Sequence, residues 1–162
     1  MVDQDLEHYV SFAISKGMKE VKQIKPESVE TAVWVRFKCQ FGCPAHGTPY
    51  CCPPDSPATE QTRAVLDCYE RALLFQIEAP DSKDRWTHCN NMFDMIVKME
   101  GEMFKDGFYK ALAFLAGPCP LCEKCGKLRT KFYLRKKSIP SGVWNNYERY
   151  IQSVVLKKYT ED

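Results

Sequence analysis

Three segments of the chain have the hydrophobic spacing of amphipathic helices. Apolar residues three or four positions apart predict a helix over residues 3–18, and a longer one over residues 82–106. A shorter helix is expected to begin with Ser56 as N-cap and Pro57 at its first position and to run to about Tyr69. The expected buried stripe of the long helix is Trp86, Phe93, Ile96, Val97 and Phe104.

Three other segments have the pattern of strands. AVWVRFK alternates, with Val33, Val35 and Phe37 on one face, and leads directly to Cys39. ALLFQIE (72–78) and FYKALAFLA (108–116) are apolar runs of strand length. Strands that alternate with helices predict an α/β or α+β domain, with a central sheet of three or more strands and right-handed crossovers.

Length and composition are those of one ordinary domain spanning residues 1–162. The chain is 44% hydrophobic and 27% charged, with a net charge of +2, which does not favour nucleic acid as a partner. The acidic start MVDQDLEHYV is unlike a signal peptide, and no apolar run reaches the roughly 20 residues that span a bilayer. We therefore expect a cytoplasmic protein without a membrane segment. Nothing in the sequence indicates its oligomeric state.

Nine cysteines are a high number for 162 residues, and in a reducing compartment they indicate metal ligands or buried thiols rather than disulfides. Cys119, Cys122 and Cys125 follow the third predicted strand with the spacing C-x2-C-x2-C. This spacing matches the first three positions of a ferredoxin-type run for a [4Fe-4S] cluster, whereas zinc usually takes separated C-x2-C pairs. The segment therefore predicts a cluster or metal site, three unliganded thiols being the alternative.

A second group of cysteines lies in CQFGCPAHGTPYCCPPDSP, residues 39–57. The prolines and glycines of this segment predict a loop, which is costly to order unless something binds it. Adjacent cysteines rarely both bind one ion, so one of Cys51 and Cys52, preferably Cys52, is expected to join Cys39 and Cys43 as a ligand. His46 lies between them and would complete a Cys3His zinc site. Both cysteine-rich loops are expected at the C-terminal ends of strands, where such sheets carry their sites.

The remaining candidates favour structural roles. Cys68 and Cys89 have no partner at ligand spacing and are expected to be small buried residues. A methionine stripe in the long helix has thioethers that can bind Cu(I), but core packing is the better prediction. Basic residues in the segment 124–137 suggest a solvated face or a docking surface for an acidic partner. The methionines are Met92, Met95, Met99 and Met103, and the histidines expected in structural or surface roles are His8 and His88.

Taken together, RFKCQFGCPAHGTPYCCPP, SPATEQTRAVLDCYERALLFQIE and AGPCPLCEKCGK resemble the prokaryotic "predicted metal-binding protein" family, domain of unknown function 2284. The resemblance covers about residues 30–127. It implies metal binding, with iron–sulfur favoured, through Cys39, Cys43 and Cys52 in the first loop and the three cysteines of the second. It implies no known reaction.

The tail after Lys127 departs from this family. Family members continue to a fourth cysteine, an Arg-Pro pair and a Gly-Ile segment, none of which is present in residues 128–162. One hypothesis is that this tail is read in a shifted frame. The three-cysteine site is then truncated, which is the favoured interpretation. The alternatives are a site open at one iron and a site completed by a cysteine of the first loop.

The function predicted from these features is iron–sulfur binding with a role in electron transfer or cluster carriage to a protein partner. A structural zinc protein acting as an interaction module is the first alternative. The second is an iron–sulfur enzyme with an open coordination position, although no catalytic motif accompanies the cysteines and a non-enzymatic role is favoured.

Overall fold

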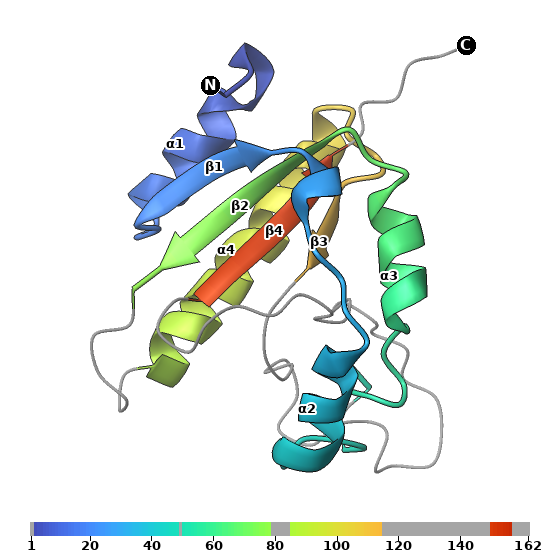
Figure 1. Cartoon of the computed structure of the whole chain (residues 1–162). Helices are drawn as coiled ribbons and strands as arrows, with labels where there is room; N and C mark the ends of the chain where they lie inside the picture. Colours follow the sequence, from blue (N-terminus) through green and yellow to red (C-terminus); the bar gives the residue numbers. More distant parts are fainter. Residues whose placement is uncertain (1, 49, 79–84, 115–149, 157–162) are drawn as a thin grey trace.

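The computed structural model of the chain describes residues 2–48, 50–78, 85–114 and 150–156, and it mixes helices with one sheet (Figure 1). The described helices are α1 (Glu7–Ser15), α2 (Trp34–Gly42), α3 (Thr59–Leu66) and α4 (Arg85–Lys105), with short 3-10 turns at η1 (Gln4–Leu6) and η2 (Pro26–Ser28). The described strands are β1 (Glu20–Ile24), β2 (Arg71–Ile77), β3 (Leu112–Phe114) and β4 (Tyr150–Leu156).

The sheet has four strands in the order β1-β2-β4-β3, and each described pair is antiparallel. Because β2 and β3 both pair with β4, they run in the same direction, and α4 connects them. The expected mixture of helices and sheet is confirmed. Neighbouring strands nevertheless do not pair in parallel, because a strand from the C-terminal tail lies between β2 and β3.

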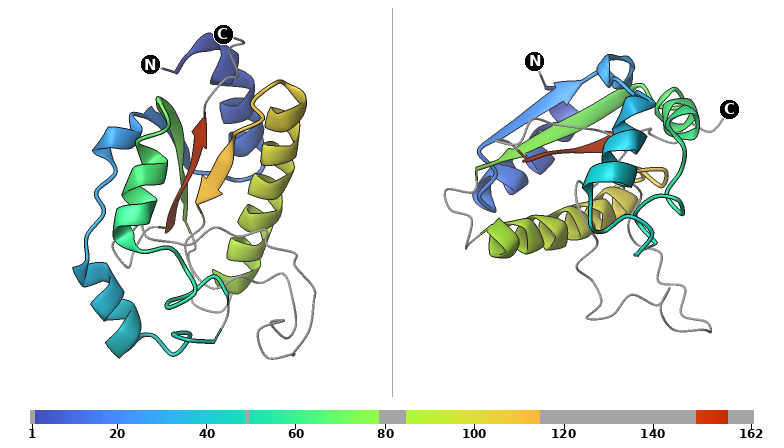
Figure 2. Two further views of the ribbon diagram at one scale, coloured as in Figure 1. Left: turned by 90° about the vertical axis from the view of Figure 1, so that its right-hand side faces the viewer. Right: turned by 60° about the horizontal axis from the view of Figure 1, so that its bottom comes forward.

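Helices cover both faces of the sheet (Figures 1 and 2). α1 and α4 lie on one face, and α3 lies on the other. The strand β2 alternates accordingly: Leu73, Phe75 and Ile77 belong to the large core under α1 and α4, while Ala72 packs with Leu66 of α3. Successive side chains of a strand point to opposite faces of the sheet. A strand covered by helices on both faces therefore has apolar residues at successive positions, as β2 does.

The long helix is buried mainly through methionines. Met92, Met95, Met99 and Met103 are at most 4% exposed, as the core-packing prediction required. Phe93 and Ile96 are buried as expected, but Phe104 is 56% exposed. The predicted stripe was therefore wrong at Phe104, because the centre of the buried face lies along the methionines. The side chain of Trp86 lies outside the described residues.

The segment AVWVRFK is a helix and not the predicted strand. Val33 already has helical backbone angles, and the amides of Val35 and Arg36 donate to Ala32 and Val33 as the first turn forms. Of the three residues expected on one strand face, only Val35 is buried. The alternation of Val33, Val35 and Phe37 was misleading because it covers only five residues. Over the longer segment that ends at Phe41, the spacing of the aromatic residues is that of a helix.

Other boundaries also differ from those predicted. The strand β1 was missed, since its sequence EVKQI has few apolar residues and forms an edge of the sheet. Ser56 is not the N-cap of α3: the helix begins at Thr59, and the amide of Ala58 donates to Gln61 Oε1 at 2.9 Å. The third strand is confirmed but covers only Leu112–Phe114.

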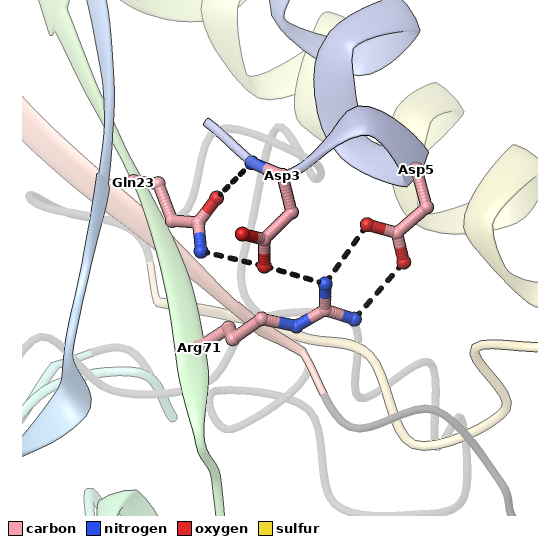
Figure 3. A network of polar contacts seen from close by, with 4 residues as sticks. All are labelled: Asp3, Asp5, Gln23 and Arg71. Carbon is pink, nitrogen blue, oxygen red and sulfur yellow. Dashed lines mark hydrogen bonds and ion pairs between the residues drawn. The ribbon is translucent and has the colours of Figure 1, made fainter. Parts of the chain in front are cut away.

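A cluster around Arg71 attaches the N-terminal segment to the sheet (Figure 3). The guanidinium of Arg71, on β2, donates to Asp5 through both terminal nitrogens at 2.9 and 3.1 Å, and to Asp3 Oδ2 at 2.9 Å. Gln23, on β1, donates to the same Asp3 oxygen and accepts from the Asp3 amide. Two strands and η1 are thereby linked by one bidentate ion pair and its neighbours.

We expect Arg71→Met to lower the melting temperature by a few degrees at pH 7, because the carboxylates lose their partner but remain hydrated. Hydrogen bonds from Arg71, and secondarily from Gln23, hold the pKa of Asp3 below its ordinary value of 3.8. The contribution of Asp3 is therefore present at neutral pH and is lost as the pH falls below that value. Thermal melts should show that the difference in melting temperature between the wild type and Arg71→Met becomes smaller as the pH falls toward 3. A difference that stays constant with pH would contradict this prediction.

Candidate metal centre

The first cysteine-rich segment lies beyond one end of the sheet. The connection from β1 leads through η2 to α2, and both α2 and the loop that follows lie at the end toward which β2 and β3 point (Figures 1 and 2). Cys39 is within α2, and Cys43 is its C-cap. The expectation that this loop follows a strand was therefore wrong: it follows a helix, and the C-x3-C spacing places the two cysteines one helical turn apart.

Backbone hydrogen bonds fold the loop back on itself. The amide of Gly47, which has a φ of +75°, donates to the carbonyl of Pro53 at 2.7 Å. His46 donates its amide to the carbonyl of Cys43 at 3.1 Å, and the carbonyl of Cys52 accepts from the amides of Asp55 and Ser56. These bonds join the two halves of the loop and order it despite its prolines. The peptide between Pro53 and Pro54 is cis.

Two arginines attach the loop and its flanking helices to each other. Arg36 of α2 donates to Ser56 Oγ at 2.6 Å and to the Ser56 carbonyl at 3.2 Å. Arg63 of α3 donates to the carbonyls of Val29 and Pro26 at 2.6 and 3.1 Å, which fixes the connection leading to α2. Neither arginine was predicted to belong to the site. An arginine close to a proline-rich loop suggests that its side chain could donate hydrogen bonds to the loop. The spacing of residues along the chain does not show which carbonyl group accepts them.

The loop cysteines are free thiols and differ in exposure. Cys51 is buried, Cys39 and Cys52 are half-buried, and Cys43 is exposed. His46 is half-buried beside them. Cys39 lies on the inner face of α2 together with Val35 and Arg36, since these positions fall on one side of the helix.

The thiols influence one another electrostatically. Burial, followed by the neighbouring thiols of Cys51, Cys43 and Cys39, raises the pKa of Cys52 to about 12. Burial and then Cys43 raise the pKa of Cys39, partly offset by Arg36. A thiolate at either position is therefore disfavoured by the others. A bound cation would reverse this, because thiolates that repel one another are each stabilised by a shared positive charge.

The described residues do not yet form a finished coordination sphere. Among them, no three His, Cys, Asp or Glu side chains are arranged so as to hold a metal ion. The structure thus places Cys39 in α2, Cys43 at its C-cap and Cys52 in the folded loop that follows, and their side chains would have to turn toward a common centre to bind one ion. A set of three thiols fits a thiophilic metal such as iron or zinc.

We expect Arg36→Met to expose the buried thiol of Cys51 in the metal-free protein. The charged hydrogen bonds to Ser56 close the loop, and such bonds contribute about 1.5–3 kcal/mol, so their loss should accelerate opening roughly tenfold or more. Alkylation by iodoacetamide, followed peptide by peptide in a mass spectrometer, measures this rate for Cys51. The matched control is Lys38→Met on the opposite face of α2; equal rates for the two variants would contradict the prediction.

Other predicted residues lie apart from this loop or outside the described residues. Cys68 is exposed rather than buried, and its Sγ donates to the carbonyl of Ala64 at 3.3 Å. His8 lies 3.4 Å from Asp106 on the surface, consistent with a structural role. Cys119, Cys122 and Cys125 and the segment 124–137 lie outside the described residues, as does the side chain of Cys89. The chain reaches Cys119 only five residues after β3 ends, a span of at most about 18 Å.

A comparison with family models matches residues 22–141 to the family described as "Predicted metal-binding protein (DUF2284)". The match extends beyond both ends of the range 30–127 and leaves residues 142–162 outside it. No curated protein and no solved structure matches the chain. Within the part of the chain that the structure describes, no helix is long and apolar enough to cross a membrane.

Proposed function

Because the chain belongs to the predicted metal-binding protein family (DUF2284), we propose that it binds a metal centre through the thiolates of Cys39, Cys43 and Cys52. The observation that carries this proposal is that α2 and the hydrogen-bonded loop after it hold these cysteines near one another, and that burial, followed by the neighbouring thiols, raises the pKa of Cys39 and Cys52. Burial and neighbouring thiols raise the pKa of Cys39 and of Cys52, and a shared cation would stabilise the thiolates at both positions. Cys51, the most buried of the four, is assigned to packing.

The centre is proposed to be iron–sulfur, with a role in electron transfer or cluster carriage. The support is the spacing of Cys119, Cys122 and Cys125, which suits a [4Fe-4S] cluster. These cysteines follow β3, which ends on the side of the molecule where α2 and its loop lie (Figure 1). If the second set of cysteines lies near the first, the two sets can form either one shared centre or two neighbouring centres.

Structural zinc is the second candidate, and His46 is the observation that favours it. Its backbone is hydrogen-bonded to Cys43 and its imidazole is half-buried within the same loop. With the three thiolates it would complete a tetrahedral Cys3His set, a common structural zinc site.

Anaerobic purification followed by iron, zinc and acid-labile sulfide analysis per chain separates these candidates. The iron–sulfur proposal expects about four irons and four sulfides for each cluster, with little zinc. Stoichiometric zinc without sulfide would support the structural site instead. Absence of both metals from protein purified in their presence would contradict metal binding by this chain.

A further inference from the structure

Solvent exposure distinguishes the three candidate ligands, Cys39, Cys43 and Cys52. Cys43 is exposed, whereas Cys39 and Cys52 are half-buried. Residues 41–44 are all exposed, so Cys43 belongs to a continuous stretch of open surface. Within the described part of the chain, a Cβ added at Gly42 would meet no heavy atom within 4 Å beyond its own helix and chain neighbours. A molecule from solution therefore reaches the candidate centre first on the side of Cys43.

The backbone at Cys43 differs from the backbone at Cys39. Cys39 lies inside α2, whereas Cys43 is the C-cap, with a φ of −114° and a ψ of 122° that are typical of extended chain. Residues at the end of a helix open locally at a smaller free-energy cost than residues within it. The Cys43 thiol can therefore move away from a shared centre more readily than the Cys39 thiol.

Hydrogen bonds attach the backbone of Cys52 to the helix that carries Cys39. Arg36 of α2 donates to Ser56 Oγ at 2.6 Å, and the amide of Ser56 donates to the carbonyl of Cys52 at 3.2 Å. Ser56 is only 5% exposed, so this connection lies in the interior. Cys39 and Cys52 are thus on segments that are fixed to each other, whereas Cys43 stands at the exposed end of the helix.

A ligand from outside replaces a protein ligand most readily where it can reach the metal ion and where the protein ligand can move away. Reactive metal centres keep one such coordination position, whereas closed structural centres fill every position with protein ligands. Sulfur and imidazole nitrogen are the donors that suit a thiolate-bound zinc or iron ion. Of the three candidate ligands, only Cys43 combines an exposed thiol with a place at the end of a helix.

We propose that Cys43 holds the exchangeable position of the centre, at which a small thiol or imidazole from solution replaces it while Cys39 and Cys52 stay bound. This inference rests on the proposed function and names the ligand through which that centre exchanges. Cys43 Sγ gives up its bond to the metal as the bond from the incoming donor atom forms. The released Cys43 thiolate takes the proton of an incoming thiol, or a proton from water when the donor is a neutral imidazole, and no electrons are transferred.

The test loads the metal-free full chain with Zn²⁺ and follows the alkylation of each cysteine by N-ethylmaleimide, mapped by mass spectrometry. The rate without zinc divided by the rate with zinc gives a protection factor for each thiol, which removes the difference in exposure between them. Cys43 should be protected about tenfold less than Cys39 and Cys52, because its bond opens locally whereas theirs break only when the metal leaves. Cys68 should show no protection, since its contact is with the carbonyl of Ala64.

The possible results separate this inference from the proposed function. If Cys39, Cys43 and Cys52 are all as unprotected as Cys68, the proposed centre fails and its exchangeable position fails with it. If the three thiols are protected equally, the centre stands but its ligands are released together, and the assignment of Cys43 is wrong. Stronger protection of Cys43 than of Cys39 or Cys52 would also overturn the assignment.

A second measurement uses Cys43→Ser and its matched control, Cys52→Ser. The protection of Cys39 by zinc is measured with and without imidazole, a zinc ligand that does not consume the maleimide as an added thiol would. Imidazole should raise this protection about fivefold or more in Cys43→Ser and less than about twofold in Cys52→Ser, because only the first variant leaves an exposed position vacant. Cys43 is exposed, so its substitution should have little effect on folding. Equal rescue of both variants, or no rescue of Cys43→Ser, would contradict the proposal.

Discussion

Cys39→Ser and Cys52→Ser should each lose the metal centre, with affinity falling more than about 100-fold. Replacement of outer residues around metal ligands already costs about 10–100-fold, and removal of a thiolate ligand exceeds this. Serine is close in size to cysteine but is not a thiophilic ligand. Metal per chain after gel filtration, and competition with a chelator at fixed pH, measure the loss.

Cys68→Ser is the matched control for these variants. Cys68 is a free, exposed thiol in the turn after α3, and its contact is with the carbonyl of Ala64 rather than with the loop. It should retain full metal content. Loss in Cys68→Ser comparable to that in Cys52→Ser would mean that metal is bound nonspecifically by exposed thiols, and the loop would no longer be the site.

Met99→Ala should lower the free energy of unfolding by about 2–5 kcal/mol, the usual cost of truncating a buried side chain of this size. Met99 is fully buried in the core between α4 and the sheet, with Met92 and Met103 on the same helix face. Met99→Leu keeps the volume and should cost less than about 1.5 kcal/mol. Denaturant titration of the two variants measures both values.

The same pair of variants tests whether the methionine stripe binds Cu(I). Leucine preserves packing but has no sulfur, so a packing role predicts that Met99→Leu keeps both its stability and its metal content. If Met99→Leu loses metal while remaining as stable as the wild type, the thioether is a ligand and the core assignment is wrong.

Sequence patterns predicted the elements that are long or buried on both faces. The apolar run of β2 and the helical period of α4 are long enough to identify each element. The helix α2 was mistaken for a strand because Val33, Val35 and Phe37 alternate over a short window. Its exposed aromatic residues, Trp34, Phe37 and Phe41, are three and four positions apart, which fits the helical period and not the alternation of a strand.

Topology was the least predictable property of the sheet. The strand β4 comes from the tail and separates β2 from β3, so the pairing of these strands depends on a segment far along the chain. No local pattern in Leu73 or Ala113 reports such a partner. The hypothesis of a shifted reading frame over residues 128–162 stays a prediction, to be tested by reading the gene.

The setting of the candidate cysteines was not predicted, and their role as metal ligands stays a prediction. Cysteine spacing selected Cys39, Cys43 and Cys52, which the structure places in α2, at its C-cap and in the loop that follows. The hydrogen bonds from Arg36 to Ser56 were not predicted, because they join residues 20 positions apart through an arginine side chain, which is ordinarily on the surface. Proline and glycine indicate where a loop lies, whereas its closure depends on particular long-range hydrogen bonds.

X-ray absorption at the metal edge of the anaerobically purified chain tests thiolate ligation most directly. The account predicts a dominant sulfur shell, at about 2.3 Å if the metal is zinc, with an additional metal–metal shell if it is an iron–sulfur cluster. This shell should lose sulfur in Cys52→Ser and remain unchanged in Cys68→Ser. A first shell of only nitrogen and oxygen near 2.0–2.2 Å would contradict a centre built from these cysteines.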